Sequence, residues 1–297
     1  MMPKQRMTLE QLQMRFGTEE KCIKHLIHLK WPDGFRCPRC GYASAYLTQT
    51  RRLPLFECRS CRHQTSPIVG TIMEGSRTPL SKWFIALYLV SHNAQGISAV
   101  ALRRKISVTY KTAWLILHKI RHAIGKLDAS LPLTGIVRVN AEQYGRPYNP
   151  TIFRHRQEHP VWIAASLIYA IEPRYMKIKL INNSHLRGRN ILKQAVAAFR
   201  ENHISSNAAQ VTFIPRRYDP QCPKVLHYRW KELRRNLWLT HRGIGRRYLQ
   251  AYLDEFCFRY NLTELTEHFF DYMTQACINS RVITLADLSG ALLESAA

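Results

Sequence analysis

Four of the eight cysteines in this chain of 297 residues fall into two short pairs. The pairs read CPRC, at Cys37 and Cys40, and CRSC, at Cys58 and Cys61, with 17 residues between them. Two such pairs at this separation supply four thiolates for one tetrahedral zinc ion. The sequence therefore predicts a structural zinc bound by these four cysteines, in a ribbon that owes most of its folding free energy to the metal.

Helical periodicity is found on both sides of the cysteine pairs. Residues 8–30 are expected to be helical, with Thr18 as an N-cap, and the ribbon is expected at 35–66. Three helices are then expected at 81–92, 97–106 and 109–124, which together are typical of a helix-turn-helix. Basic side chains of this segment are predicted to contact DNA, mostly at phosphates: Arg103, Arg104, Lys105, Lys111, Lys119 and Arg121. A solvated helix in a basic protein would show a similar pattern.

The second half of the chain alternates apolar runs with short breaks, which predicts a mixed α/β sheet. Strands are expected at 136–141, 161–170, 175–181 and 211–214. Helices are expected at about 186–202, 226–238 and 246–260. The predicted domains are a helix with the zinc ribbon at 1–66, a helix-turn-helix at 67–130, an α/β domain at 131–262 and a helical C-terminal tail at 263–297.

The charge of the chain limits the kind of partner. Lysine and arginine number 44 against 20 acids, so the formal net charge is +24, which predicts a polyanion as partner. The chain has no apolar run of 18 residues and no signal-peptide core, so a cytoplasmic, nucleoid-associated protein without membrane contact is expected. A zinc-ribbon RNA-binding or scaffold protein would also suit the charge, but the helix-turn-helix favours double-stranded DNA.

Long ordered segments resemble one family. The segments WPDGFRCPRCG, CRSCRHQTSPIVGTIMEGSRTPLSKWF and GISAVALRRKISVTYKTAWLILHKIRHAI are similar to the opening of insertion-sequence transposases that carry a zinc ribbon before a DDE nuclease domain. The later segment WKELRRNLWLTHRGIGRRYLQAYLDEFCFRYN is similar to the stretch that follows their last catalytic carboxylate. The resemblance implies a ribonuclease-H-like domain, DNA cleavage and strand transfer at element ends with magnesium or manganese, and a homo-oligomer.

The chain departs from this family at the catalytic acids, which hold two divalent metals. In the family's pattern the first acid would stand at Asn140, in VRVNAEQYGR. The second would stand at Ile214 or Pro215, and the third at His227. An amide, an apolar side chain and an imidazole bring no negative charge to a dication, so the nuclease centre is predicted to be degenerate. We expect a DNA-binding protein related to transposases but without DDE catalysis, a pseudoenzyme.

Three other acids could act as displaced ligands in an active transposase: Glu142, Asp219 and Glu232. Glu142 would share a strand face with Asn140 if the strand continued that far, but the sequence favours a solvent-exposed loop acid at this position. Asp219 lies four or five residues late, and Glu232 is about 140° around a helix from His227. Only five acids occur from Ile136 to Lys231, against sixteen lysines and arginines, which disfavours two bound dications.

Overall fold

The computed structural model describes residues 7–93, 95–145, 154–169, 172–215, 224–265 and 269–288. The chain divides into two compact units. The first unit comprises Met1–His92, Ala99–Ala123 and Glu267–Ile283, and the second comprises Asn93–Ser98, Ile124–Thr266 and Thr284–Ala297. Of the predicted C-terminal tail at 263–297, residues 267–283 belong to the first unit and the others to the second.

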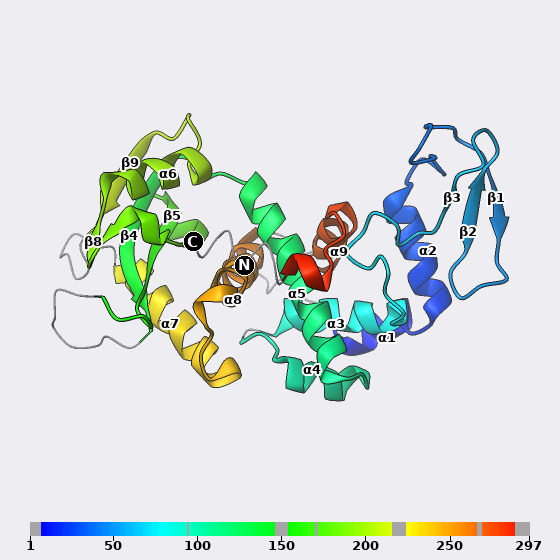
Figure 1. Ribbon diagram of the computed structural model, residues 1–297, viewed down its shortest axis with the longest axis horizontal. Helices are drawn as coiled ribbons and strands as arrows, with labels where there is room; N and C mark the ends of the chain where they lie inside the picture. Colours follow the sequence, from blue (N-terminus) through cyan, green and yellow to red (C-terminus); the bar gives the residue numbers. More distant parts are fainter. Residues whose placement is uncertain are drawn as a thin grey trace. The chain divides into compact units, whose positions relative to one another are not determined.

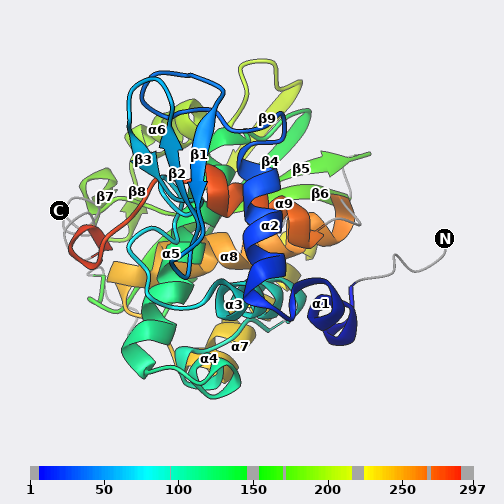
Figure 2. The same ribbon diagram turned by 90° about the vertical axis from the view of Figure 1, so that its right-hand side faces the viewer.

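Two helices and a small sheet open the first unit. Helix α1 (Leu9–Phe16) and helix α2 (Glu19–Lys30) are separated by Gly17 and Thr18, and the Thr18 side chain accepts a hydrogen bond from Lys21 N as the predicted N-cap. The strands β1 (Ala45–Thr48), β2 (Leu55–Cys58) and β3 (Gln64–Thr65) form an antiparallel sheet in the order β1-β2-β3 (Figures 1 and 2). Trp31, Phe35 and Phe56 pack as the only aromatic cluster among the described ribbon residues. Such a small cluster stabilises little by itself, so the ribbon depends on its metal.

Helices make up the rest of the first unit. They are α3 (Leu80–His92), α4 (Ala99–Ile106), the first part of α5 (Tyr110–Ser130) and α9 (Phe269–Asn279). The division between the units falls inside α5, after Ala123. Phe16 of α1 contacts Phe84 of α3 and Phe270 of α9, with ring centroids 4.8 and 5.3 Å apart. Aromatic burial of this kind attaches α9 to helices more than 180 residues earlier in the chain.

The second unit is built on a mixed sheet of four strands: β4 (Ile136–Tyr144), β5 (His159–Ile168), β6 (Glu172–Leu180) and β9 (Gln210–Ile214). The order is β6-β5-β4-β9, with β9 parallel to β4 and the other pairs antiparallel. Helix α6 (Lys193–His203) covers one face, and α7 (Lys224–His241) and α8 (Arg246–Leu265) cover the other. The predicted α/β class and the predicted order of three strands, a helix and a fourth strand are confirmed.

One predicted helix begins too early. A 3₁₀ turn (Asn183–His185) and a hairpin of β7 (Leu186–Arg187) with β8 (Asn190–Ile191) precede α6, so residues 186–191 are not helical. Gly188 occupies the hairpin turn with φ of 60°, a conformation that glycine adopts without steric cost. The helix therefore starts at Lys193 and not at 186.

Helix α8 satisfies the outer backbone groups of β6, the first strand in the sheet order. The Asn261 side chain accepts from Met176 N at 2.7 Å and donates to Met176 O at 2.9 Å. The Gln250 side chain accepts from Leu180 N and donates to Ile178 O. Two amide side chains three turns apart on α8 thus take the place of a neighbouring strand.

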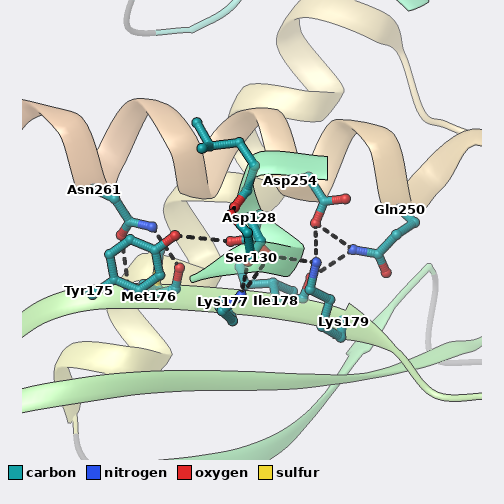
Figure 3. A network of polar contacts seen from close by, with 11 residues as sticks. Asp128, Ser130, Tyr175, Met176, Lys177, Ile178, Lys179, Gln250, Asp254 and Asn261 are labelled. Carbon is teal, nitrogen blue, oxygen red and sulfur yellow. Dashed lines mark hydrogen bonds and ion pairs between the residues drawn. The ribbon is translucent and has the colours of Figure 1, made fainter. Parts of the chain in front are cut away.

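A cluster of buried charges joins α5, β6 and α8 within the second unit (Figure 3). The Lys177 ammonium, whose side chain is fully buried, lies 3.0 Å from an Asp128 carboxylate oxygen. The Lys179 ammonium lies 2.7 Å from both Asp128 and Asp254. Two lysines and two aspartates balance in charge, which is the condition under which buried charges are tolerated.

Candidate functional site

The four predicted zinc ligands converge in the ribbon. One ligand atom from each of Cys37, Cys40, Cys58 and Cys61 lies within 4.8 Å of the other three. The Sγ atoms of Cys37 and Cys61 are 3.6 Å apart, as are those of Cys40 and Cys58. Zn–S bonds of about 2.3 Å in a tetrahedron place the sulfurs about 3.8 Å apart. The four cysteines therefore fit a structural zinc ion, which confirms the predicted cofactor.

Two matching turns hold these sulfurs. Gly41 and Arg62, each directly after the second cysteine of a pair, have φ of 75° and 59°. Gly41 N donates to Cys37 O and Arg62 N donates to Cys58 O, which closes each turn. A backbone hydrogen bond lowers the pKa of the Cys61 thiol, but burial and contacts with the other thiols outweigh it and raise this pKa. Burial raises the pKa of the Cys37 thiol, but backbone N–H groups of Cys40 and Arg39, together with the Cys61 and Cys40 thiols, outweigh burial and lower this pKa to about 6. The turn thus favours the thiolate, the form that binds zinc.

The predicted helix-turn-helix is present as α4, a three-residue turn and α5. Ser107 takes φ of 48°, and Val108 N donates to Arg103 O, which closes the end of α4. Thr109 then caps α5, because its Oγ1 accepts from Thr112 N at 3.2 Å. The exposed cations around this turn are Arg103, Arg104, Lys105 and Lys111. They form a basic surface at the end of α4 and the start of α5, which we call the α4–α5 surface.

Two of the six side chains predicted to contact DNA are buried. Lys119 and Arg121 are only 6% and 2% exposed, and the Lys119 ammonium donates to Glu74 O at 3.2 Å. His118 of the same helix is also only 2% exposed. Residues 113–124 of α5 are therefore largely buried, and the exposed cations of this helix are Lys111 near its start and Lys126 near its end.

In the second unit, the region of the expected catalytic acids holds a carboxylate–imidazole pair. Strand β4 continues to Tyr144, so Glu142 lies within the strand and is 5% exposed. The expectation of an exposed loop acid is thus wrong. His227 Nδ1, on α7, lies 2.8 Å from Glu142 Oε1, so a hydrogen bond joins this helix to the strand. The pair links His227, which stands at the expected third acid position, to Glu142, which lies two residues beyond Asn140 at the expected first position.

The other residues considered as catalytic acids or their substitutes lie in the sheet, on α7 or outside the described ranges. Asn140 is 2% exposed and pairs in register with Ile214 on β9, directly before Pro215. Glu232 is bonded to Arg229 at 2.8 Å, a different partner from that of Glu142. Asp219 lies outside the described residues. Within the described ranges, no group of three or more His, Cys, Asp or Glu ligands other than the zinc cysteines was found.

The pKa of a buried histidine reflects nearby positive charge on this face of the sheet. His159 of β5 pairs in register with Tyr144 of β4 and is 8% exposed. Burial lowers its pKa, and the guanidinium groups of Arg246 and Arg154 lower it further, to about 4. A field that disfavours an imidazolium also disfavours a bound dication.

The depressed pKa of His159 predicts a loss of stability in mild acid. Below about pH 6.5 the unfolded chain protonates this histidine while the folded chain does not, so the free energy of unfolding falls as pH drops from about 6.5 to about 4, by at most about 3 kcal/mol. Urea unfolding at pH 7 and pH 4.5 measures this loss. A His159→Gln variant should lose less stability over the same range, and an unchanged loss would contradict the assignment.

Alternation along β4 could have revealed the burial of Glu142 from the sequence. Val137, Val139 and Ala141 face α6, and Tyr144 belongs to the core under α7 and α8. Asn140 and Glu142 therefore share the face of Tyr144, because side chains alternate along a strand. The contact with His227 has no such local signal, since 85 residues separate the two side chains.

The zinc knuckles, the helix-turn-helix and the mixed sheet define a zinc-ribbon protein with an α/β domain. Residues 17–64 match the family described as "Transposase zinc-ribbon domain". An "Uncharacterized protein in transposable element ISH50" of Halobacterium salinarum is 28% identical over 127 residues, which cover 42% of this chain and 42% of that protein. Both matches support the resemblance to insertion-sequence transposases, and the N-terminal segment is a transposase zinc ribbon.

The extent of these similarities is limited. The aligned part of the chain spans less than half of the ISH50 protein, and the zinc-ribbon match ends before α3 begins. No solved structure matches the chain. None of the helices in the described ranges is both long and apolar enough to cross a bilayer.

Proposed function

We propose that the protein binds double-stranded DNA at the ends of a transposable element and lacks DDE catalysis. The transposase zinc ribbon and the net charge of +24 support DNA as the partner. The α4–α5 surface supplies the phosphate contacts, from Arg103, Arg104, Lys105 and Lys111. A helix-turn-helix presents the start of its second helix to the major groove. Lys111 lies at that start, and Arg103, Arg104 and Lys105 lie at the end of the preceding helix.

The Glu142–His227 contact is the observation that carries the second part of the proposal. A nuclease of the DDE type needs several carboxylates directed at two metals about 4 Å apart. Here the buried Glu142 carboxylate is hydrogen-bonded to the His227 imidazole, which stands at the expected third acid position. Asn140 occupies the expected first acid position. The region can contact a phosphate backbone but does not concentrate the negative charge that magnesium requires.

Removing charge from the α4–α5 surface should weaken duplex binding. We expect Arg103→Gln, Arg104→Gln and Lys105→Gln together to lower affinity for element-end DNA at least tenfold and to reduce the salt slope by about 3, since each phosphate contact contributes about 0.9. Fluorescence anisotropy across a salt series measures both. The matched control changes three exposed cations of the second unit: Arg187, Lys193 and Arg200. Equal losses in both variants would show non-specific charge and contradict the assignment.

The competing proposal is an active transposase that uses displaced carboxylates. Zinc-loaded protein would then nick its flanking DNA with magnesium or manganese but not with EDTA, and Glu142→Gln or Asp219→Asn would abolish the nicking. We expect binding without metal-dependent cleavage. The resemblance also suggests a homo-oligomer, which we propose from it alone and which sedimentation on and off DNA would test.

A further inference from the structure

The outward face of α7 carries three cations and two aromatic rings. These residues are Lys224, Tyr228, Lys231, Arg235 and Trp238, which we call the α7 stripe. At 100° per residue their side chains fall within about 40° of one direction along the helix. All five are exposed, with Tyr228 at 62% and Trp238 at 53%. The stripe is therefore one continuous surface of a single helix.

The opposite face of α7 fixes this orientation. Leu226, Trp230, Leu233 and Leu237 are at most 6% exposed and pack in the core between the sheet and α8. Trp230, at 1% exposed, is an ordinary core residue, whereas Trp238 two turns later is not. These buried side chains fix which face of α7 packs on the core. Tyr228 and Trp238 are exposed because the helical period places them on the opposite face.

The charge of α7 indicates which partner the α7 stripe suits. The helix has five lysines and arginines and one acid, Glu232, which is already paired with Arg229. Two copies of so basic a surface would repel each other, so the exposed rings are poorly suited to self-association. A partner must instead be anionic and offer flat groups for stacking, which is the combination that single-stranded nucleic acid presents.

We propose that the α7 stripe binds single-stranded DNA, with Tyr228 and Trp238 stacking on unpaired bases and Lys224, Lys231 and Arg235 contacting phosphates. Ten residues separate the two rings, about 15 Å along the helix, which is room for about four stacked nucleotides. This activity goes beyond the proposed duplex binding, because it uses a different element in the other unit. It would let one chain bind both an opened strand and the duplex that the α4–α5 surface recognises.

The test compares single-stranded and duplex binding in the full-length, zinc-loaded protein. Tyr228→Ala and Trp238→Ala should each weaken binding of labelled (dT)20 by about 5- to 150-fold and leave binding of a hairpin duplex within twofold. Trp238 fluorescence should also be quenched by (dT)20. The matched control is Leu239→Ala, which removes a side chain that is 51% exposed, has no ring to stack and lies about 100° around the helix from Trp238.

The charge contribution is measured separately. Lys231→Gln with Arg235→Gln should reduce the salt slope of (dT)20 binding by about 1.4, at about 0.7 for each phosphate contact. Unchanged (dT)20 affinity in both ring variants would overturn the proposal. So would ring variants that shift the sedimentation coefficient, because they would identify a protein interface. The α4–α5 variant serves as the reverse control, because it should lose duplex binding and retain (dT)20 binding. Failure of the duplex-binding proposal can then be told apart from failure of the single-strand proposal.

Discussion

Replacing Cys58 with serine abolishes stoichiometric zinc binding and unfolds the ribbon. Cys58 is buried, and its Sγ lies among three others at tetrahedral spacing, so three thiolates remain for an ion that needs four. Structural zinc contributes about 10 to 16 kcal/mol of apparent binding free energy, far more than the Trp31–Phe35–Phe56 cluster can replace. Metal analysis should fall from one zinc per chain toward zero, and amide exchange across residues 35–66 should become fast.

The control for this experiment is Ser60→Ala, in the same turn and exposed. It should retain one zinc per chain and slow exchange. Excess EDTA should reproduce the serine phenotype in the unmodified protein while the amides of the mixed sheet stay protected. One zinc per chain in Cys58→Ser would show that the ion is bound elsewhere.

Replacing Asp128 with asparagine should be the most destabilising single change in the second unit. It leaves the Lys177 ammonium, which has no solvent exposure, without its carboxylate. Breaking one partner of a buried ion pair costs about 3 to 5 kcal/mol, because the remaining charge is uncompensated. Urea unfolding at pH 7, followed by tryptophan fluorescence, should show this loss as a lower midpoint with an unchanged slope.

A surface pair provides the comparison. Glu20→Gln breaks an exposed ion pair with Lys24 and should leave the urea midpoint almost unchanged. Burial raises the pKa of Asp128, but the Lys179 and Lys177 ammonium groups outweigh burial and hold it below its usual value. The contribution of Asp128 is therefore complete at neutral pH and is lost only as pH falls below about 4. An Asp128→Asn midpoint equal to the unmodified one would contradict the role of the cluster.

Local chemistry in the sequence was enough to predict the zinc site and most elements. The cysteine spacing identified all four ligands, and Thr18 was correctly placed as an N-cap, because both depend on neighbours within a few residues. The early start assigned to α6 had a local cause as well. Gly188 indicates a turn, but the apolar pattern of residues 186–202 favoured one continuous helix.

Errors arose where burial comes from distant segments. Lys119 and Arg121 lie beside apolar residues on α5, and a helical period alone cannot show that a second side of the helix is covered. Glu142 was assigned to a loop because strand length depends on the partner, and pairing with β5 extends β4 to Tyr144. The side chain of Glu142 is then buried against a histidine from another helix, a contact that no short-range pattern contains.

The hydrogen bonds of α8 to β6 limit how this sheet can grow. An uncovered edge strand offers its backbone to any extended segment and is a common origin of aggregation. On β6 that backbone is already bonded to Asn261 and Gln250, so a foreign strand would have to displace two side chains held on a helix. Among the described strands of the sheet, β9 is the other end of the order. Addition of a strand at β6 is therefore disfavoured, even where many copies of the chain lie close together.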